Sequence, residues 1–337
     1  MPLLNFTNIS ELFKITPPQS AVRRDCQMEN VSNGYTNWSL GVIAFFILYE
    51  VAKGATKNGK KTGKDWQMLG IAVTWLHFIE RPLLILCSFG LYTLVMPERA
   101  GTLAWLEDQY LLACIIGFVM IDELLHGWVH NFSHARTPDN PILAKLQRWY
   151  KITHRTHHLH GGADDRGELG VSQTIVVGWG WAFTLPNYWF GYLCLYLGLF
   201  QAWAIGTAIK SIWGIHTHAN LDYDLKLLNH PNPIVSKTMY ALCHILTFPT
   251  QHHHHHSRSR TSGCNLQNML ALYDWLLWKK LAIEFERPKI YGWRKNEKEE
   301  NSVLYRYFYR QLQRANNTTP NIAPDKRASR GPELEQI

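Results

Sequence analysis

The chain contains 337 residues, of which 46% are hydrophobic, 13% aromatic and only 18% charged. This composition excludes a mainly disordered chain and a small disulfide-stapled domain. The net charge of +8 suits nucleic acid, anionic lipid or the cytoplasmic face of a membrane. Because the sequence has no helix-turn-helix, zinc-finger or RNA-binding signature, no nucleic-acid partner is expected.

The N-terminal third combines a polar leader with apolar runs. Residues 1–38 are polar, and residues 39–109 are predicted to form an N-terminal transmembrane region. Within it, the apolar run 68–96 is interrupted at Pro82. The run predicts either one long tilted helix broken at the proline or two interfacial pieces.

The region 110–290 is predicted to be the functional domain. Its apolar run 110–125 precedes a polar stretch, and residues 171–215 form a second apolar region with Pro186 inside it, which predicts a helical hairpin. Residues 291–337 form a polar tail, and the part after about Asn316 is expected to be disordered.

Charge predicts the orientation of these segments in a membrane. The Lys-rich stretch 53–65 is expected on the cytoplasmic side by the positive-inside rule. Counting crossings from there places residues 126–170 and 216–337 on the cytoplasmic side too. This topology depends on charge and apolar runs alone, yet it gathers nearly every histidine on one face of the membrane.

Fourteen of the 17 histidines fall in four short clusters. The first recurs every four residues at 126, 130 and 134, following Asp122, so a helix would align it in one stripe. The second and fourth each contain H-x-x-H-H, starting at His154 and at His252. The third lies at the end of the predicted hairpin, at 216 and 218. By contrast, the isolated His77, His230 and His244 are interpreted as ordinary amphipathic residues.

Imidazole is a neutral ligand for iron, zinc and copper, and helical i, i+3 and i+4 pairs direct two nitrogens toward one centre. Four clusters supply enough nitrogens for two metals. The competing interpretations are purely structural histidines and a non-catalytic zinc-binding membrane protein, such as a scaffold or transporter. A transporter favours ionisable groups at the bilayer midplane, whereas these histidines lie beyond the ends of the apolar runs.

The order of motifs from 110 to 280 resembles the sterol desaturase/fatty acid hydroxylase superfamily of membrane-bound, histidine-rich oxygenases. The matching elements are Asp122, His130-x-x-x-His134, the two H-x-x-H-H motifs, His218-Ala219-Asn220 and a segment from Asn265 to Asp274. In the first cluster the pairs His126/His130 and His130/His134 both fit, and the second is favoured. Asn131 departs from the family pattern, which often has arginine there.

The resemblance implies an all-α fold: a polytopic transmembrane bundle of about four or five spans with a cytosolic, histidine-rich, metal-binding helical cap. It implies a dinuclear non-haem iron centre, with zinc as the alternative metal. The implied reaction uses O2 and two electrons to hydroxylate an unactivated C–H bond of a sterol or fatty acyl lipid, and a lipid desaturase is the alternative. The electron donor would be a cytochrome, a ferredoxin or a reductase.

No acid or base beyond the metal centre is required for the reaction. The predicted metal ligands are nine histidines: His130, His134, His154, His157, His158, His218, His252, His255 and His256. His126, His216 and His253 are second-rank candidates. Asp122 and Asp274 are expected to fix the tautomers of the ligands, and Asp164, Asp165 and Asp222 are further candidates. The predicted location is the endoplasmic reticulum in a eukaryote or the inner membrane in a bacterium, with the metals on the cytoplasmic face.

Overall fold

The fold is taken from a computed structural model, which describes residues 41–54, 61–158, 167–292, 303–304 and 307–308. The polar leader 1–38 and the tail after Asn316 lie outside these residues. Every regular element within them is helical, and the one extended pairing is an isolated bridge between Ser257 and Tyr291. The predicted all-α class is therefore confirmed for the described part of the chain.

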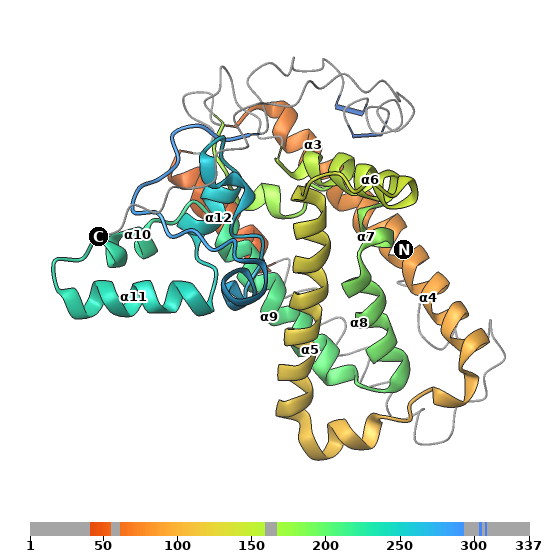
Figure 1. The fold of residues 1–337 in the computed structure, drawn as a ribbon. Helices are drawn as coiled ribbons and strands as arrows, with labels where there is room; N and C mark the ends of the chain where they lie inside the picture. Colours follow the sequence, from red (N-terminus) through yellow and green to blue (C-terminus); the bar gives the residue numbers. More distant parts are fainter. Residues whose placement is uncertain (1–40, 55–60, 159–166, 293–302, 305–306, 309–337) are drawn as a thin grey trace.

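Two long helical segments dominate the molecule (Figure 1). The first runs over Gly63–Val95 and comprises α3 (Gly63–Trp75), the π-helical turn η2 (Leu76–Glu80) and α4 (Arg81–Val95). The second is α5 (Ala104–His134), reached through the 3-10 turn η3 (Pro97–Arg99). The chain therefore passes Pro82 without breaking, because the π turn precedes it and the proline occupies the first turn of α4.

Both segments are long and apolar enough to cross a membrane. Only 22% and 33% of their most apolar stretches are buried, so most of these side chains face outward, unlike those of a soluble core helix. α5 is kinked at Tyr110, whose φ and ψ of -134° and 43° are not helical. At 1.5 Å per residue, the part from residue 111 to His134 is about 36 Å long and still exceeds the ~30 Å hydrocarbon core of a bilayer. A shorter apolar helix, Gly41–Ala52, precedes them.

The predicted hairpin is present, but its turn lies elsewhere. Pro186 begins α8 (Pro186–Leu197) instead of interrupting it, because proline is favoured in the first helical turn. The chain reverses at Gly198, whose φ of 98° suits glycine, and continues as α9 (Phe200–His218). The 3-10 turn η4 (Val171–Thr174) and the short helix α7 (Trp181–Thr184) precede α8.

The long helices pack against this hairpin. α5 contacts both α8 and α9, and α4 contacts α8 (Figure 1). Gly206 on α9 lies directly against the ring of Phe118 on α5, which lets the two backbones approach closely. The same core includes Val119, Cys194 and Ala202. This packing fixes α5 and α9, whose C-terminal ends carry histidines.

The remaining helices lie around the histidine-bearing end of α5. They are α6 (Pro141–His158), α10 (Tyr223–Leu228), α11 (Pro233–Ile245), α12 (Pro249–His255) and α13 (Ala271–Tyr273), with the 3-10 turn η5 (Arg260–Gly263) and the π turn η6 (Asp274–Trp278). α6 packs on α5, and α12 packs on α9. Segments far apart in sequence thus converge at one end of the bundle.

Candidate metal centre

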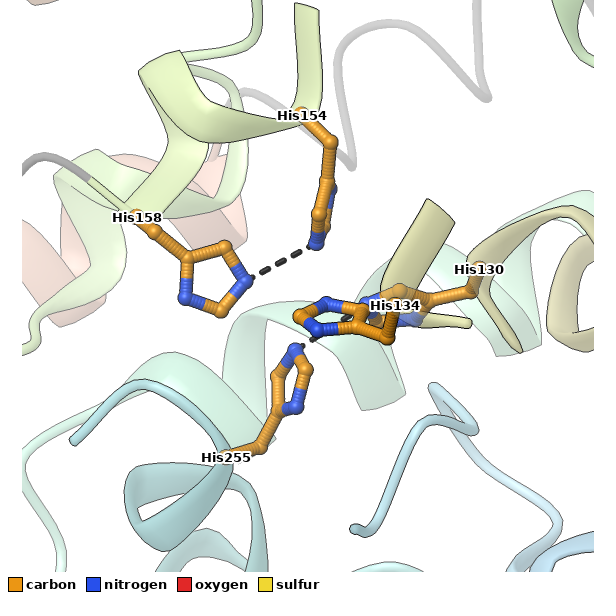
Figure 2. A group of neighbouring side chains, drawn as sticks. All are labelled: His130, His134, His154, His158 and His255. Atoms are coloured by element: carbon orange, nitrogen blue, oxygen red, sulfur yellow. Dashed lines mark hydrogen bonds between the residues drawn. The ribbon is translucent and has the colours of Figure 1, made fainter. Parts of the chain in front are cut away.

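Nine histidines form two compact groups at this end. The five-histidine group contains His130, His134, His154, His158 and His255 (Figure 2). The four-histidine group contains His157, His218, His252 and His256. In each group, one nitrogen from every residue lies within 4.8 Å of all the others. The structure thus brings together all nine residues predicted from the sequence, in groups that could each hold a metal ion.

Helical geometry explains how each H-x-x-H-H motif serves both groups. His154 and His158 are one turn apart on α6 and share one face, so both enter the five-histidine group. His157, three residues after His154, lies on the adjoining edge of the same face and enters the four-histidine group. The motif of α12 is divided in the opposite sense: His252 and His256 enter the four-histidine group and His255 the five-histidine group. Each motif therefore links the two groups.

The nitrogens that face one another are separated by distances typical of ligands on one metal. Nε2 of His154 and His158 are 2.8 Å apart, and Nε2 of His130 and His255 are 3.0 Å apart. In the other group, Nε2 of His218 lies 3.1 Å from Nε2 of both His157 and His252. Two nitrogens bound to one metal at about 2.1 Å lie about 3.0 Å apart at a right angle.

In three of these histidine rings, a backbone carbonyl determines which of the two nitrogens carries the proton. Nδ1 of His130 donates to the carbonyl of Leu266, and Nδ1 of His255 donates to that of Cys264 at 3.1 Å. Nδ1 of His218 donates to the carbonyl of Gly214 at 2.6 Å. A carbonyl oxygen only accepts hydrogen bonds, so each neutral ring exposes a lone pair at Nε2. The Nε2 atoms of His130 and His255 therefore face each other with no hydrogen between them.

Burial keeps these rings neutral. The pKa values of His154, His157, His158, His252 and His255 are all lowered well below 6.5, chiefly because burial disfavours the charged imidazolium. Neighbouring histidines lower them further. Opposed lone pairs repel, and a shared proton would introduce a buried charge. A metal cation accepts several of these lone pairs at once, which removes their repulsion and distributes its charge over the ligands, so the donor set fits a metal.

The two groups share a border. The rings of His158 and His256 are stacked with centroids 4.2 Å apart, although they belong to different groups. His157 and His256 are in contact within the four-histidine group, with centroids at 4.6 Å. The arrangement therefore places two candidate metal positions side by side within one buried layer of imidazoles.

The second-rank histidines lie outside both groups. The ring of His126 adjoins that of His130 with centroids 5.6 Å apart, but His126 belongs to neither group, so the favoured pair is His130/His134. Nε2 of His216 contacts the hydroxyl of Tyr223 at 2.6 Å. Nε2 of His253 donates to the carbonyl of Ala219 at 3.1 Å. His160, Asp164 and Asp165 lie outside the described residues.

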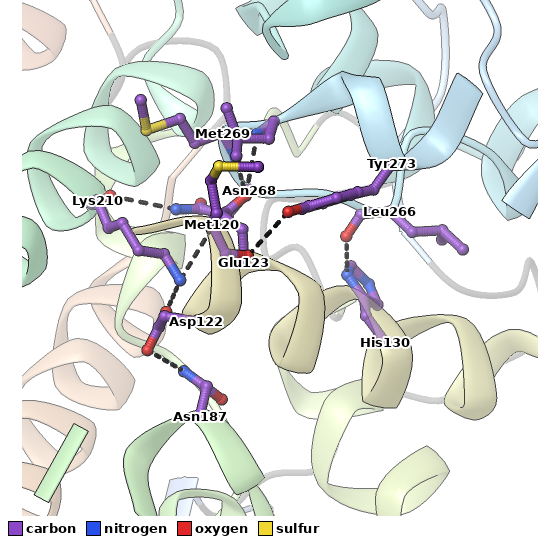
Figure 3. Close-up of polar contacts among 11 residues, drawn as sticks. Met120, Asp122, Glu123, His130, Asn187, Lys210, Leu266, Asn268, Met269 and Tyr273 are labelled. Carbon is purple, nitrogen blue, oxygen red and sulfur yellow. Dashed lines mark hydrogen bonds and ion pairs between the residues drawn. The ribbon is translucent and has the colours of Figure 1, made fainter. Parts of the chain in front are cut away.

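The prediction that carboxylates fix the ligand tautomers is corrected by the contacts (Figure 3). Asp122 pairs with Lys210 of α9, and Asp274 accepts from the backbone N–H of Gln267 at 2.9 Å. Asp222 forms an exposed pair with Lys226. Asp122 is therefore paired with a lysine, and for His130, His218 and His255 backbone carbonyls take the role expected of the carboxylates.

Sequence reasoning missed Glu123, which anchors the segment that supports His130 (Figure 3). Its fully buried carboxylate accepts from the backbone N–H groups of Met269 and Leu270 at 2.8 and 3.0 Å, and it lies 2.9 Å from Nζ of Lys210. This segment follows Leu266 directly. The sequence signal for this role is the pair of adjacent carboxylates, Asp122 and Glu123, at the end of the apolar run 110–125. A carboxylate in that position requires a buried hydrogen-bond or charge partner.

No family model matches the chain, and neither does any curated protein or solved structure. The function is therefore inferred from the geometry of the site.

Proposed function

We propose that the protein is a membrane-bound oxygenase with a dinuclear non-haem metal centre, in which each histidine group holds one ion. The observation that carries this proposal is the pair of bare Nε2 atoms of His130 and His255, 3.0 Å apart, with both Nδ1 atoms donating to carbonyls. The same arrangement recurs around His218 in the other group. The family resemblance of the motifs points to the same class.

The ligand types and numbers favour iron. Imidazole suits iron, zinc and copper, but a structural zinc site is closed by four ligands, whereas one group here offers five. Iron held by these two groups would supply the O2 activation needed to attack an unactivated C–H bond, with two electrons supplied from outside. The chain itself buries eight of the nine histidines, and it fixes three ligand tautomers through the carbonyls of Leu266, Cys264 and Gly214.

A lipid substrate follows from the position of the groups. His130 and His134 occupy the last two turns of α5, one of the two helices long and apolar enough to span a membrane. A sterol or fatty acyl chain dissolved in the bilayer would approach the centre from the apolar part of that helix. We propose hydroxylation as the reaction; desaturation begins with the same hydrogen abstraction and is the alternative product.

An acidic electron-donor protein fits the charge of the histidine-bearing end. Arg136, Lys145 and Arg148 are exposed on or just before α6, whose buried face carries His154, His157 and His158. Complementary charge accelerates such encounters. We infer a multi-pass membrane protein with this end on the cytoplasmic side, served by a cytochrome, ferredoxin or reductase.

Lipid-dependent O2 uptake tests the proposal. The iron-loaded full chain, in detergent with a chemical or protein reductant, should consume O2 faster when sterols or fatty acyl lipids are added, with product detected by mass spectrometry. His157→Ala and His255→Ala should abolish this uptake while the protein still inserts into membranes. His254→Ala is the matched control, because Nε2 of His254 donates to the carbonyl of Glu286 and lies outside both groups. Normal turnover in both group variants, or zinc alone without O2 uptake, would overturn the proposal.

A further inference from the structure

An exposed apolar surface lies beside α5, between its middle and its histidine-bearing end. It consists of three consecutive residues of the π turn η6, Trp275, Leu276 and Leu277, together with Leu242 and Ile245 of α11. Their exposed fractions range from 39% to 52%. Three adjacent large apolar side chains exposed together are costly in water, so this surface needs a partner.

Two hydrogen bonds fix the π turn against α5. The hydroxyl of Tyr273 donates to the carbonyl of Met120 at 3.0 Å, and Nζ of Lys280 donates to Oδ1 of Asn131 at 2.7 Å. Residues 275–277 lie between these two anchors in sequence. On α5, the stretch between Met120 and Asn131 carries the exposed side chains of Ile121, Leu124 and Trp128. The apolar surface therefore continues the outward-facing apolar side of α5.

α11 extends the surface sideways. It runs crosswise to α5 (Figure 1) and contacts α13, and the ring of His244 lies 5.0 Å from that of Trp275. One side of α11 buries Met239 and Cys243, whereas Ile234, Leu242 and Ile245 are exposed on another side. A helix that is apolar on an unpartnered side and lies across the spanning direction is typical of an element in the membrane interface.

Charge identifies the partner. The exposed charged residues of α11 and of the segment 274–280 are Lys237 and Lys279, both positive, while the one acid there, Asp274, is fully buried. Tryptophan and leucine followed by two lysines is the order found where a chain leaves the hydrocarbon for the headgroups. Lysines at this level favour anionic phospholipid.

We propose that residues 275–277 and the exposed side of α11 insert into the interfacial region of an anionic bilayer, on the side of the histidine groups. This inference depends on the proposed membrane location and specifies it: the hydrocarbon ends near Trp128, two residues before His130 and six before His134 on α5. The histidine groups then lie just outside the hydrocarbon, at headgroup depth.

Site-specific photo-crosslinking tests this assignment. A photoreactive phenylalanine analogue replaces Leu276, Ile245, Leu112 or Lys226, one at a time, in the full chain reconstituted into vesicles of phosphatidylcholine and phosphatidylglycerol. Leu112 lies on the exposed apolar side of α5 and reports spanning, and Lys226 lies exposed on α10 and reports water. Retained metal content in each variant shows that the fold is intact.

We expect phospholipid adducts at Leu276 and Ile245 with a yield comparable to that at Leu112. We expect no phospholipid adduct at Lys226. Adducts at Leu112 alone would overturn this inference and leave the membrane location standing. Absence of adducts at all positions would overturn both. A cross-link from Leu276 to a second copy of the chain would identify a protein interface in place of the bilayer and would also overturn the inference.

Discussion

Replacing Lys210 by methionine should destabilise the protein far more than the same change at Lys226. Nζ of Lys210 lies 2.9 Å from a carboxylate oxygen of Glu123 and also contacts Asp122. The side chains of Lys210, Asp122 and Glu123 are only 10%, 9% and 0% exposed. Lys226 pairs with Asp222 at the same kind of distance, 3.0 Å, but these side chains are 72% and 59% exposed.

Burial sets the magnitude. Removing one partner of a buried pair leaves an uncompensated charge and costs about 3–5 kcal/mol. An exposed pair at the same separation contributes about 0–1 kcal/mol, because water and salt screen it. Lys210→Met should therefore lower the free energy of unfolding by at least about 3 kcal/mol, and Lys226→Met by about 1 kcal/mol or less.

Denaturant titration in detergent micelles, followed by circular dichroism, measures both free energies of unfolding. Adding Glu123→Gln and Asp122→Asn to Lys210→Met should recover part of the loss, because no buried charge then lacks a counter-ion. Equal, small losses in Lys210→Met and Lys226→Met would refute the reasoning, since they would show that the Lys210 cluster is solvated.

Three further outcomes are expected. His255→Ala should lower the metal content of the purified protein, whereas His254→Ala should leave it unchanged, as measured by element-resolved mass spectrometry. Gly206→Ala should destabilise the protein by about 1–3 kcal/mol, because the new Cβ overlaps an aromatic ring of α5. In the same titration, Gly117→Ala should be neutral or stabilising, because open space surrounds Gly117. The metal-free protein should be most stable above pH 6.5 and should lose stability as the pH falls. Burial lowers the pKa of the histidines of α6 and α12, so the unfolded chain binds protons at a higher pH than the folded chain does. Unchanged stability between about pH 7.5 and 5 would contradict this expectation.

The sequence predicted the histidine layer well because helical spacing constrains it. Residues one turn apart share a face, so His130 and His134, and likewise His154 and His158, had to point together. Apolar runs likewise located α5, since hydrophobic periodicity and length depend on local sequence. These features required no knowledge of distant contacts.

The features of the site that the sequence did not predict depend on contacts between segments far apart in the chain. The division of the nine histidines into groups of five and four depends on how α6 and α12 approach α5 and α9. For His130, the choice of a backbone carbonyl over Asp122 as the tautomer-fixing acceptor depends on Leu266, more than a hundred residues away. The apolar run predicts a hairpin interrupted at Pro186, whereas Pro186 begins α8 and the turn falls at Gly198.

Metal stoichiometry tests the central claim most directly. The full chain is purified in detergent from iron-supplemented cells without metal-affinity resin, and its metals are counted by element-resolved mass spectrometry. Two adjacent histidine groups predict about two iron ions per chain, one for each group, and loss of metal in His157→Ala. A chain that folds normally and holds no metal, or holds only zinc that iron does not replace, would contradict the account.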